Sequence, residues 1–293
     1  MINRIFTPGS EWLYFKLYMG DKSADTILNQ EIKQLIHFLK NNYIIDQWFF
    51  IRYNDPNFHL RIRVHLINPD FSGIVLRYIN LFFTTKVQNH IIWNIQLDTY
   101  KRELERYNIF LIEKLEYLFC LNSECIIDLI PFFKKMNVDS RWKVGIYMID
   151  KFLTICKIPI YDKIEIFKEL SISFKYEFGF DKYNSKQFNE KYRYYKKDIF
   201  KILERDNQDI TINKCFNIID LYLTLGQTTY LSIKNISNQK SINLKSILNS
   251  FIHMMINRII PFNNRLYELI IYDFLFRYYM SLNVRISQNL NQQ

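Results

Sequence analysis

The chain of 293 residues is rich in apolar and aromatic residues, at 49% and 17% of the total, and carries a net charge of +10. This composition excludes an intrinsically disordered protein, and the length allows one large or two modest hydrophobic cores. The positive charge indicates an acidic partner or substrate without identifying it, since nucleic acid, an acidic peptide, an anionic membrane surface or tRNA would all fit.

The four cysteines, at positions 120, 125, 156 and 215, show neither a Cys-x-x-Cys pair nor the spacing of zinc ligands. We therefore expect free thiols in a reducing compartment. The N-terminal stretch MINRIFTPGSEW lacks the apolar core of a signal peptide, and no uncharged apolar run approaches the roughly 18 residues that span a bilayer. These features predict a cytoplasmic protein with no membrane span and no structural metal.

The first hundred residues combine strand and helix patterns. Alternating apolar residues predict strands, and apolar residues three and four apart predict helices. The predicted strands cover residues 12–18, 48–53, 59–66 and 90–100, and the predicted helices cover residues 26–42 and 71–85. A turn-rich tetrad at Asn54–Asn57 joins the middle strands in a hairpin. This β-α-β-β-α-β order predicts a ferredoxin-like antiparallel sheet for residues 1–100.

Residues 101–293 form a second, mainly helical half, because apolar residues recur there at helical spacing almost throughout. The predicted helices cover residues 103–122, 124–136, 141–157, 163–178, 188–204, 212–225, 244–260 and 264–282. The fold class is therefore α+β with a helical majority. We expect the two halves to form one cooperative unit.

The stretch FFIRYNDPNFHLRIRVH carries the first candidate site. Side chains two apart in a strand share a face, so one face of the second strand carries His59, Arg61, Arg63 and His65. Arg52 and Tyr53 lie on the neighbouring strand and are assigned to the same constellation. Such a face either meets solvent and nearby carboxylates or forms a platform that binds anions.

The stretch YKRELERY carries the second candidate site. Arg102 and Arg106 are four residues apart and are predicted on one face of a helix, with Glu103 and Glu105 on its sides. Arginine can grip a carboxylate with two parallel hydrogen bonds, which suits a glutamate-like group. Surface ion pairs within the helix are the alternative interpretation.

The stretch HMMINR carries the third candidate site. His253 and Asn257 lie one turn apart on an otherwise apolar predicted helix, and Arg258 follows directly. Histidine titrates near neutral pH and suits proton transfer. A hydrogen-bonded core histidine is the alternative, although three polar residues near the end of an apolar helix exceed what simple packing requires.

These stretches resemble a known family when taken in chain order. WLYFKLY, WFFIRYNDPNFHLRIRVH, YKRELERY, RWKVGIYMIDKFL and HMMINR with NRLYE are similar to the C-terminal elimination domain of lanthipeptide dehydratases. That domain also occurs as a stand-alone protein in lanthipeptide and thiopeptide biosynthesis. The resemblance covers nearly the whole chain. The family usually continues the arginine helix as RYGG, whereas this chain has Asn108-Ile109, so the glycine-dependent turn is expected to be lost.

The resemblance implies a reaction and its partners. The chain would remove glutamate from glutamylated Ser or Thr of a ribosomally synthesised precursor peptide, leaving dehydroalanine or dehydrobutyrine. A glutamyl-tRNA-dependent dehydratase partner would attach the glutamate, and the precursor's leader and core would be the substrate. No metal or organic cofactor is required. A homodimer is a further expectation.

The resemblance also implies roles for the candidate residues. Arg61 or Arg63, together with Arg102, would hold the glutamyl group, and His253 would transfer the proton. Asn257 and Arg258 would orient the His253 helix or the substrate. Further substrate-binding candidates are Arg52, His59 and Arg106.

Two other functions remain open. The pyridine synthases of thiopeptide pathways resemble the elimination domain in fold, join two dehydroalanines in a formal cycloaddition and release the leader peptide. They tend to lose the glutamate-handling arginines, so the motifs HLRIR and YKRE favour elimination. A non-catalytic subunit would instead dock the leader peptide or a dehydratase partner, with an edge strand of the sheet available for β-augmentation.

Overall fold

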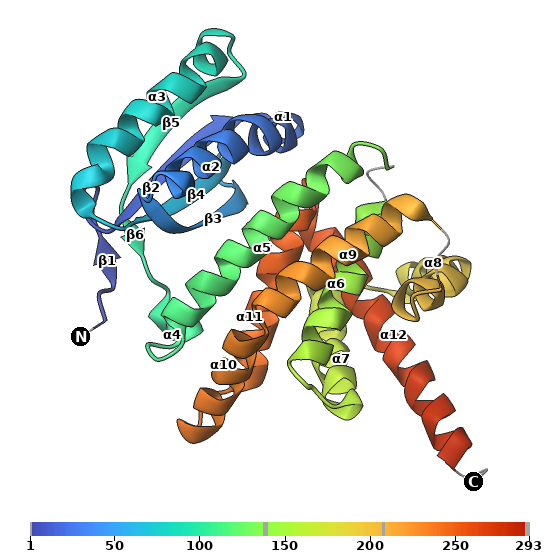
Figure 1. Ribbon diagram of the computed structural model, residues 1–293. Coiled ribbons are helices and arrows are strands. Elements are labelled where there is room, and N and C mark those ends of the chain that lie inside the picture. Colours follow the sequence, from blue (N-terminus) through green and yellow to red (C-terminus); the bar gives the residue numbers. More distant parts are fainter. Residues whose placement is uncertain (1, 137–139, 207–208, 291–293) are drawn as a thin grey trace. The chain divides into compact units, whose positions relative to one another are not determined.

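A computed structural model describes residues 2–136, 140–206 and 209–290. By its internal contacts the chain divides into two compact units (Figure 1). The first unit comprises Met1–Lys135 and Thr228–Phe262, and the second comprises Met136–Gln227 and Asn263–Gln293. The first unit therefore extends past the change of architecture near residue 100. The expectation of one cooperative unit stays a prediction.

The first unit is built on a four-stranded antiparallel sheet with the order β3-β4-β2-β5. The strands are β2 (Trp12–Met19), β3 (Ile45–Asn54), β4 (Phe58–Leu66) and β5 (Ile92–Asp98). The helical connections are α1 (Asp21–Ile27), the π-helical η1 (Leu28–Ile32), α2 (Lys33–Asn41), the 3-10 turn η2 (Pro69–Phe71) and α3 (Ser72–Gln88). This topology is ferredoxin-like, so the predicted fold class is confirmed (Figure 1).

One face of the sheet is apolar and fully buried. The register places side chains of β4 directly opposite those of β2 on this face: Leu60 with Leu17, Ile62 with Phe15 and Val64 with Leu13. Burial of each such side chain contributes about 1.5–3 kcal/mol. The other face carries the charged residues, so the strand alternation expected from the sequence is present.

After the sheet, the chain forms a short ladder before it turns helical. β1 (Ile5–Phe6) pairs with β6 (Tyr100–Lys101), and the Arg102 N–H donates to the Arg4 carbonyl. α4 (Leu104–Tyr107) is a single turn that is followed by Asn108, whose φ is 65°. The predicted helix over residues 103–122 is therefore wrong in its first part, because the chain breaks at Asn108.

Three further helices complete the first unit: α5 (Ile112–Phe133), α10 (Gln227–Gln239) and α11 (Leu244–Ile259). α5 is one continuous helix where the sequence predicts two, over residues 103–122 and 124–136, and Pro131 lies inside its last turn. The polar sequence of α10 gives no clear helical signal, and its buried residues are Tyr230, Ile233 and Ser237. α11 matches its prediction and begins at Asn243, whose side chain caps it.

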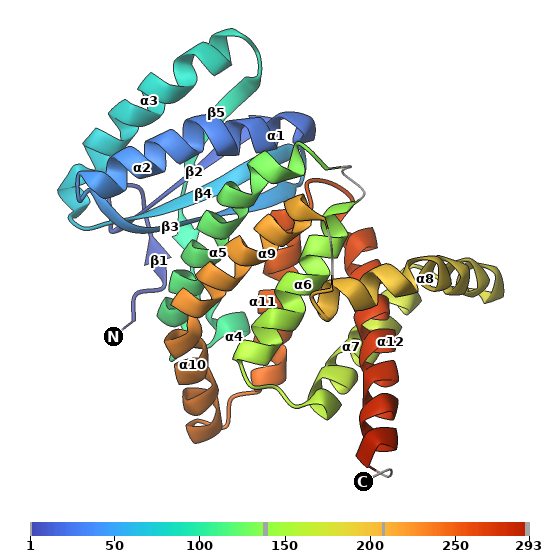
Figure 2. The same cartoon turned by 45° about the vertical axis from the view of Figure 1, so that its right-hand side comes forward.

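The second unit is helical over the part of it that is described (Figure 2). Its helices are α6 (Arg141–Ile155), α7 (Ile160–Glu177), α8 (Lys182–Leu203), α9 (Ile210–Leu225) and α12 (Asn264–Leu290). Two fully buried carboxylates on α12 have cationic partners: Glu268 pairs with Arg265, and Asp273 pairs with Arg277 and Lys175. These ion pairs indicate a structural role for both carboxylates.

The cysteines and the hydropathy of the helices agree with the sequence expectations. All four cysteines are buried and unbridged, so the prediction of free thiols is confirmed. None of the described helices is long and apolar enough to cross a membrane.

Candidate active site

The polar face of the sheet brings together the predicted cationic residues and several aromatic ones. The register places on this face His59, Arg61, Arg63 and His65 of β4, Tyr14, Lys16 and Tyr18 of β2, and Tyr53 of β3. Lys16 is bound by Asp98 of β5 at 2.6 Å, and His65 by Asp46 at 2.6 Å. Within the described residues, Arg61 and Arg63 of this face form no ion pair with a protein carboxylate, in contrast to Lys16 and His65.

Arg52 lies on the opposite face, because it pairs in register with Leu60. Its Nη2 donates to Asp25 of α1 at 2.6 Å, and its Nε donates to the Arg258 carbonyl at 3.1 Å. Arg52 was grouped with the Arg61 face as part of one constellation, and the structure separates the two. The hairpin sets this register: Asn54 pairs with Phe58, so Tyr53 pairs with His59 and Arg52 with Leu60.

Arg61 is positioned by a buried histidine and a tyrosine ring. The Arg61 Nε donates to His59 Nε2 at 3.1 Å, and its guanidinium lies 3.4 Å from the centre of the Tyr53 ring. His59 Nδ1 lies 2.8 Å from the Asn57 carbonyl. This pattern requires a neutral imidazole with its proton on Nδ1. Burial lowers the pKa of His59, and the charges of Arg61 and Lys16 lower it further against the opposing hydrogen bond to Asn57.

Arg63 has an environment of aromatic rings. Only 7% of Arg63 is exposed, and its guanidinium lies 4.5 Å from the ring of Tyr14, 4.8 Å from that of Tyr100 and 5.2 Å from that of Phe49. Its Nε and Nη1 are buried and have no hydrogen-bond partner within the described residues. A buried guanidinium without partners is costly, and a bound anion would offset that cost.

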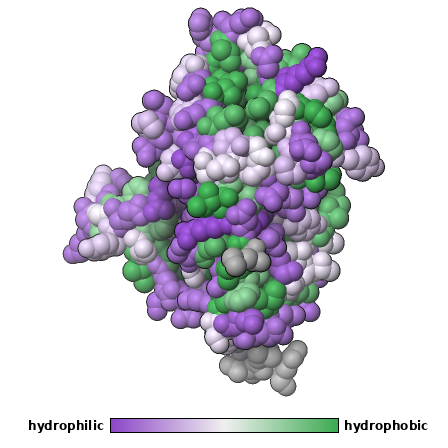
Figure 3. All heavy atoms as spheres, turned by 90° about the vertical axis from the view of Figure 1, so that its left-hand side faces the viewer, coloured by the Kyte–Doolittle hydropathy of each residue, from purple (hydrophilic) through white to green (hydrophobic). Residues whose placement is uncertain are grey.

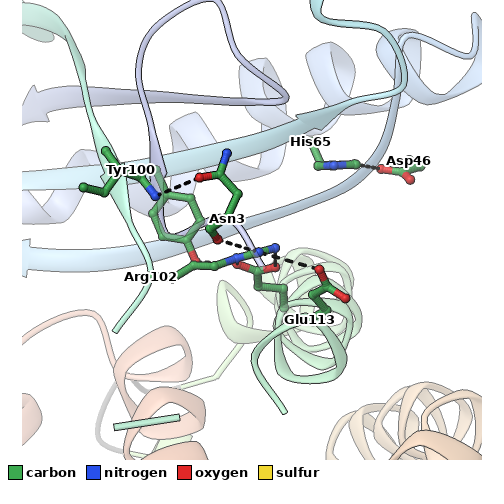
Figure 4. A network of polar contacts seen from close by, with 8 residues as sticks. Asn3, Asp46, His65, Tyr100, Arg102 and Glu113 are labelled. Carbon is green, nitrogen blue, oxygen red and sulfur yellow. Dashed lines mark hydrogen bonds and ion pairs between the residues drawn. The ribbon is translucent and has the colours of Figure 1, made fainter. Parts of the chain in front are cut away.

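Arg102 has the opposite environment (Figure 4). Its Nε and Nη2 donate to the Glu116 carboxylate at 2.8 and 2.6 Å, and its Nη1 donates to the Asn3 carbonyl at 2.9 Å. Tyr100 also donates to Glu116, at 2.7 Å, and Glu113 lies 3.6 Å from Arg102. Arg102 precedes α4, so the prediction that it shares a helical face with Arg106 is wrong. Its guanidinium is already gripped by a protein carboxylate.

Arg106 is the arginine of this segment that reaches the histidine helix. Its side chain is 37% exposed and lies 3.5 Å from Glu103. Its Nε donates to Ser250 of α11 at 3.1 Å, and Ser250 lies one turn before His253 on that helix. The structure therefore connects Arg106 with the predicted proton-transfer residue. Ser250 was identifiable only from its helical spacing to His253.

Asn257 and Arg258 tie the end of α11 to β3. The Asn257 amide donates to the Arg52 carbonyl at 2.8 Å and accepts from the Arg52 N–H at 3.0 Å, as a neighbouring strand would. Arg258 is fully buried and donates to the Phe50 carbonyl at 2.8 Å and to Asn122 at 3.1 Å. Burial lowers the pKa of Arg258 to about 9. Of the two predicted roles, these contacts favour orientation of the helix.

The turn after α4 is present despite the missing glycines. Asn108 has φ 65° and ψ 143°, a combination that glycine adopts most easily and that is strained for a residue with a side chain. Its side chain accepts from the Phe110 N–H at 3.0 Å. The expected loss of the turn is therefore not seen.

The aromatic surround of Arg63 was missed by sequence reasoning. Tyr14 could have been predicted on the face of Arg63, since it alternates with apolar residues in the strand WLYFKLY. Tyr100 could not, because the short β1–β6 ladder brings it to the site. Within the described part of the chain, no three His, Cys, Asp or Glu side chains converge to hold a metal ion.

The chain thus combines a ferredoxin-like sheet, whose polar face carries Arg61 and Arg63, with a helical remainder. The family model described as "Lantibiotic biosynthesis dehydratase C-term" matches residues 12–279. The chain belongs to this family.

Two curated relatives and two solved structures extend this finding. NisB, a nisin biosynthesis protein of Lactococcus lactis subsp. lactis, is 32% identical over 143 residues, which are 47% of this chain and 13% of NisB. SpaB, a subtilin biosynthesis protein of Bacillus subtilis, is 24% identical over 182 residues, which are 61% of this chain and 18% of SpaB. The chain thus matches less than a fifth of either relative.

The solved structures share the fold at low sequence identity. The tRNA-dependent lantibiotic dehydratase MibB from Microbispora sp. 107891 matches with a TM-score of 0.73 and 18% identity, over 97% of this chain and 29% of MibB. The pyridine synthase TbtD from thiomuracin biosynthesis matches with a TM-score of 0.64 and 7% identity, over 92% of this chain and 99% of TbtD.

Proposed function

We propose that the chain catalyses glutamate elimination from glutamylated serine or threonine of a ribosomally synthesised precursor peptide, in lanthipeptide or thiopeptide bacteriocin biosynthesis. Membership of the dehydratase family supports this class of chemistry. The observation that carries the proposal is Arg63, a buried cation whose Nε and Nη1 have no partner within the described residues. A glutamyl carboxylate supplies the missing anion.

The two arginines of β4 suit the two carboxylates that the reaction handles. A glutamate held by an ester has one free carboxylate, and elimination converts its ester group into a second. Arg61 and Arg63 lie two residues apart on one strand face, so their backbones are about 7 Å apart. Arg63 binds the free carboxylate between its aromatic neighbours. Arg61, held by His59 and Tyr53, stabilises the departing carboxylate.

Proton transfer is assigned to the helix that carries His253. In the proposed step, His253 accepts the Cα proton, the Cβ–O bond breaks, and a Cα=Cβ double bond forms. The electron pair of the broken bond leaves with glutamate. Arg106 reaches the same helix at Ser250 and remains partly exposed, so it is placed to stabilise the developing enolate oxygen. Arg102, which the family resemblance placed on the glutamyl group, has no part in this step, because its guanidinium already binds Glu116.

The glutamylation step is assigned to a separate glutamyl-tRNA-dependent partner, because the proposed groups supply only the elimination chemistry. The leader and glutamylated core of the precursor peptide are then the ligands of this chain. Aminoacyl-tRNA and buried free thiols fit a reducing cytoplasmic setting.

Mass spectrometry of a precursor peptide with glutamylated serines tests the proposal. The wild-type chain is expected to convert each glutamyl-serine to dehydroalanine, and Arg63→Met and His253→Ala to leave the glutamylated peptide unchanged. Arg77→Met is a matched control, since Arg77 is exposed on α3, and it is expected to keep full activity. An inactive wild-type chain on a peptide that a known dehydratase converts would refute elimination.

A cycloaddition is the competing reaction, because TbtD shares the fold over 92% of this chain. A fully dehydrated precursor peptide separates the two reactions. Release of a leader fragment from that peptide, with no change in the glutamylated one, would assign the chain to the cyclases. A chain that binds the leader peptide and alters neither substrate would be a docking subunit.

A further inference from the structure

The polar face of the sheet carries a carboxylate close to its two candidate arginines. The register aligns Arg63 of β4 with Tyr14 of β2, and Tyr14 with Asp98 of β5. Adjacent strands are about 4.8 Å apart, so the backbones of Arg63 and Asp98 are about 10 Å apart. Burial raises the pKa of Tyr14, and the charges of Arg63, Arg61 and Lys16 oppose this rise. The charge of Asp98 adds to it, so the Tyr14 hydroxyl lies within electrostatic reach of all four groups.

The side chain of Asp98 belongs to the polar face because side chains alternate along β5. Leu97 pairs in register with Phe15 of the apolar face, whereas Asp98 pairs with Tyr14. Leu97 is 38% exposed, and Leu81 of the adjacent α3 is 67% exposed. Figure 3 shows apolar side chains gathered near the top of the face that it draws, at the end of the first unit that holds α3 and β5. Asp98 is directed away from these apolar groups and onto the face of the candidate site.

Asp98 is held in place and ionised. Its Oδ1 accepts a hydrogen bond from the Thr99 N–H at 2.7 Å, and its Oδ2 lies 2.6 Å from Lys16 Nζ. Burial raises the pKa of Asp98, but the bonds to Lys16 and Thr99 and the charge of Arg61 bring it below its usual value. Each carboxylate oxygen can accept two hydrogen bonds, and 39% of the Asp98 side chain is exposed. Asp98 therefore has the capacity to bind a further cationic group.

The substrate of the proposed reaction brings such a group. A glutamyl group that comes from glutamyl-tRNA is joined through its α-carboxyl and keeps a free α-amino group, which is protonated near neutral pH. Four bonds separate this ammonium from the free carboxylate, so the two lie about 5 Å apart. Lys16, Arg61 and Arg63 repel an ammonium, and a carboxylate on the same face offsets that repulsion.

We propose that Asp98 binds the α-ammonium of the glutamyl group and makes the site select a glutamyl group over a glutaryl group, which lacks the ammonium. This inference rests on the proposed elimination of glutamate. The glutamyl Cα carries both the ammonium and the ester, and the groups assigned to them are neighbours: Lys16 pairs in register with Arg61 and binds Asp98. Arg63 then holds the free carboxylate at the other end of the glutamyl group.

Two peptides that differ in one amino group test the proposal. An amide-linked glutamyl peptide and its glutaryl counterpart cannot undergo elimination, so fluorescence anisotropy measures their binding alone. The measurement is made at about pH 6.5, where the α-amino group is protonated. The wild-type chain is expected to bind the glutamyl peptide at least about tenfold more tightly than the glutaryl peptide. Equal binding of the two peptides by the wild-type chain would overturn the proposal.

Variants separate selection by Asp98 from a structural role. Asp98→Asn is expected to reduce the preference for the glutamyl peptide to less than about twofold. Asp46→Asn is the matched control, because Asp46 also binds a residue of the polar face, His65, at 2.6 Å (Figure 4), and it is expected to keep the preference. An equal loss of affinity for both peptides in Asp98→Asn, with the preference retained, would show a structural role and overturn the proposal.

A double variant removes the charge that Asp98→Asn leaves unpaired. Lys16 without its partner would itself repel the ammonium, so Lys16→Met is combined with Asp98→Asn. This chain is also expected to show no preference, and a recovered preference would overturn the proposal. Elimination from the ester-linked glutamyl peptide is measured separately by mass spectrometry. Absence of elimination refutes the proposed function, whereas elimination without a glutamyl preference refutes only the role of Asp98.

Discussion

Arg63 and Arg102 are both buried in the first unit, yet their surroundings differ. Arg102 is held by two hydrogen bonds to Glu116 and one to the Asn3 carbonyl. Arg63 is surrounded by the rings of Tyr14, Tyr100 and Phe49. Tyr100 connects the two, since its ring faces Arg63 and its hydroxyl donates to Glu116.

The difference is between a guanidinium that a protein carboxylate neutralises and one that keeps unused N–H groups. A buried guanidinium with a bidentate carboxylate is neutralised within the protein, and its removal affects stability. A buried guanidinium with unused N–H groups retains the capacity to bind an anion from outside. Counting arginines in a motif does not reveal this difference, which depends on what lies around each one.

Removal of Glu116 is expected to have the largest effect on stability. Glu116→Leu leaves Arg102 charged and unpaired in a buried position, so we expect the free energy of unfolding to fall by about 3–5 kcal/mol. Urea unfolding followed by circular dichroism measures it. Glu113→Gln is the matched control, because Glu113 is exposed and 3.6 Å from Arg102, and it is expected to lose less than about 1 kcal/mol. Equal losses of stability in the two variants would show that Glu116 does not hold Arg102 more strongly than the exposed Glu113 does.

The separation of Arg102 from Arg106 depends on the turn at Asn108. Its φ of 65° is strained for a residue with a side chain. Asn108→Gly removes that strain but also the hydrogen bond to the Phe110 N–H, so a gain in unfolding free energy of about 1 kcal/mol is expected. The same urea titration measures it. Asn257→Gly, inside α11, is the contrasting control and is expected to destabilise. A loss of stability in Asn108→Gly would mean that the turn does not need positive φ.

Replacement of Arg63 is expected to leave stability nearly unchanged. Arg63→Met removes buried N–H groups that lack partners as well as favourable contacts with aromatic rings, and these effects oppose each other. We expect the free energy of unfolding to change by less than about 1 kcal/mol in thermal and urea unfolding. A loss as large as that of Glu116→Leu would show that Arg63 is a structural cation too.

The smallest expected effect concerns His59, which holds Arg61. Because the pKa of His59 is lowered in the folded chain, the unfolded chain binds a proton more readily. Stability contributed by neutral His59 is then present above about pH 6.5 and is lost as pH falls below it. Unfolding free energies measured between pH 8 and pH 5 are expected to decline more for the wild type than for His59→Phe. Parallel profiles would exclude a lowered pKa.

The sequence predicted the sheet well because strand alternation and the hairpin turn are local signals. It also predicted the histidine helix, whose apolar spacing continues from residue 244 to 260. It placed Arg102 in a helix because helical spacing is a local signal. The hydrogen bond from the Arg102 N–H to the Arg4 carbonyl joins residues nearly a hundred positions apart, and no local pattern reports it. Sequence reasoning grouped Arg52 with the Arg61 constellation without working out its face, which the hairpin register places opposite to that of Arg61.

The surroundings of the candidate site were beyond sequence reasoning. Glu116 appears in the sequence as one more acidic residue on a helix, and its burial against Arg102 arises only from tertiary packing. Helix α10 was missed because few of its residues are buried. The sequence thus identified the candidate arginines, and their different roles could be inferred only from what surrounds each one.

The central claim is that Arg63 binds the glutamyl carboxylate. It is tested most directly with a peptide in which an amide replaces the ester, so that glutamate cannot be eliminated. Fluorescence anisotropy is expected to show at least about tenfold tighter binding of the glutamyl peptide than of its glutaminyl counterpart, a difference of about 1.4 kcal/mol. Arg63→Met is expected to abolish this preference, and Arg77→Met to keep it. An undiminished preference in Arg63→Met would contradict the account.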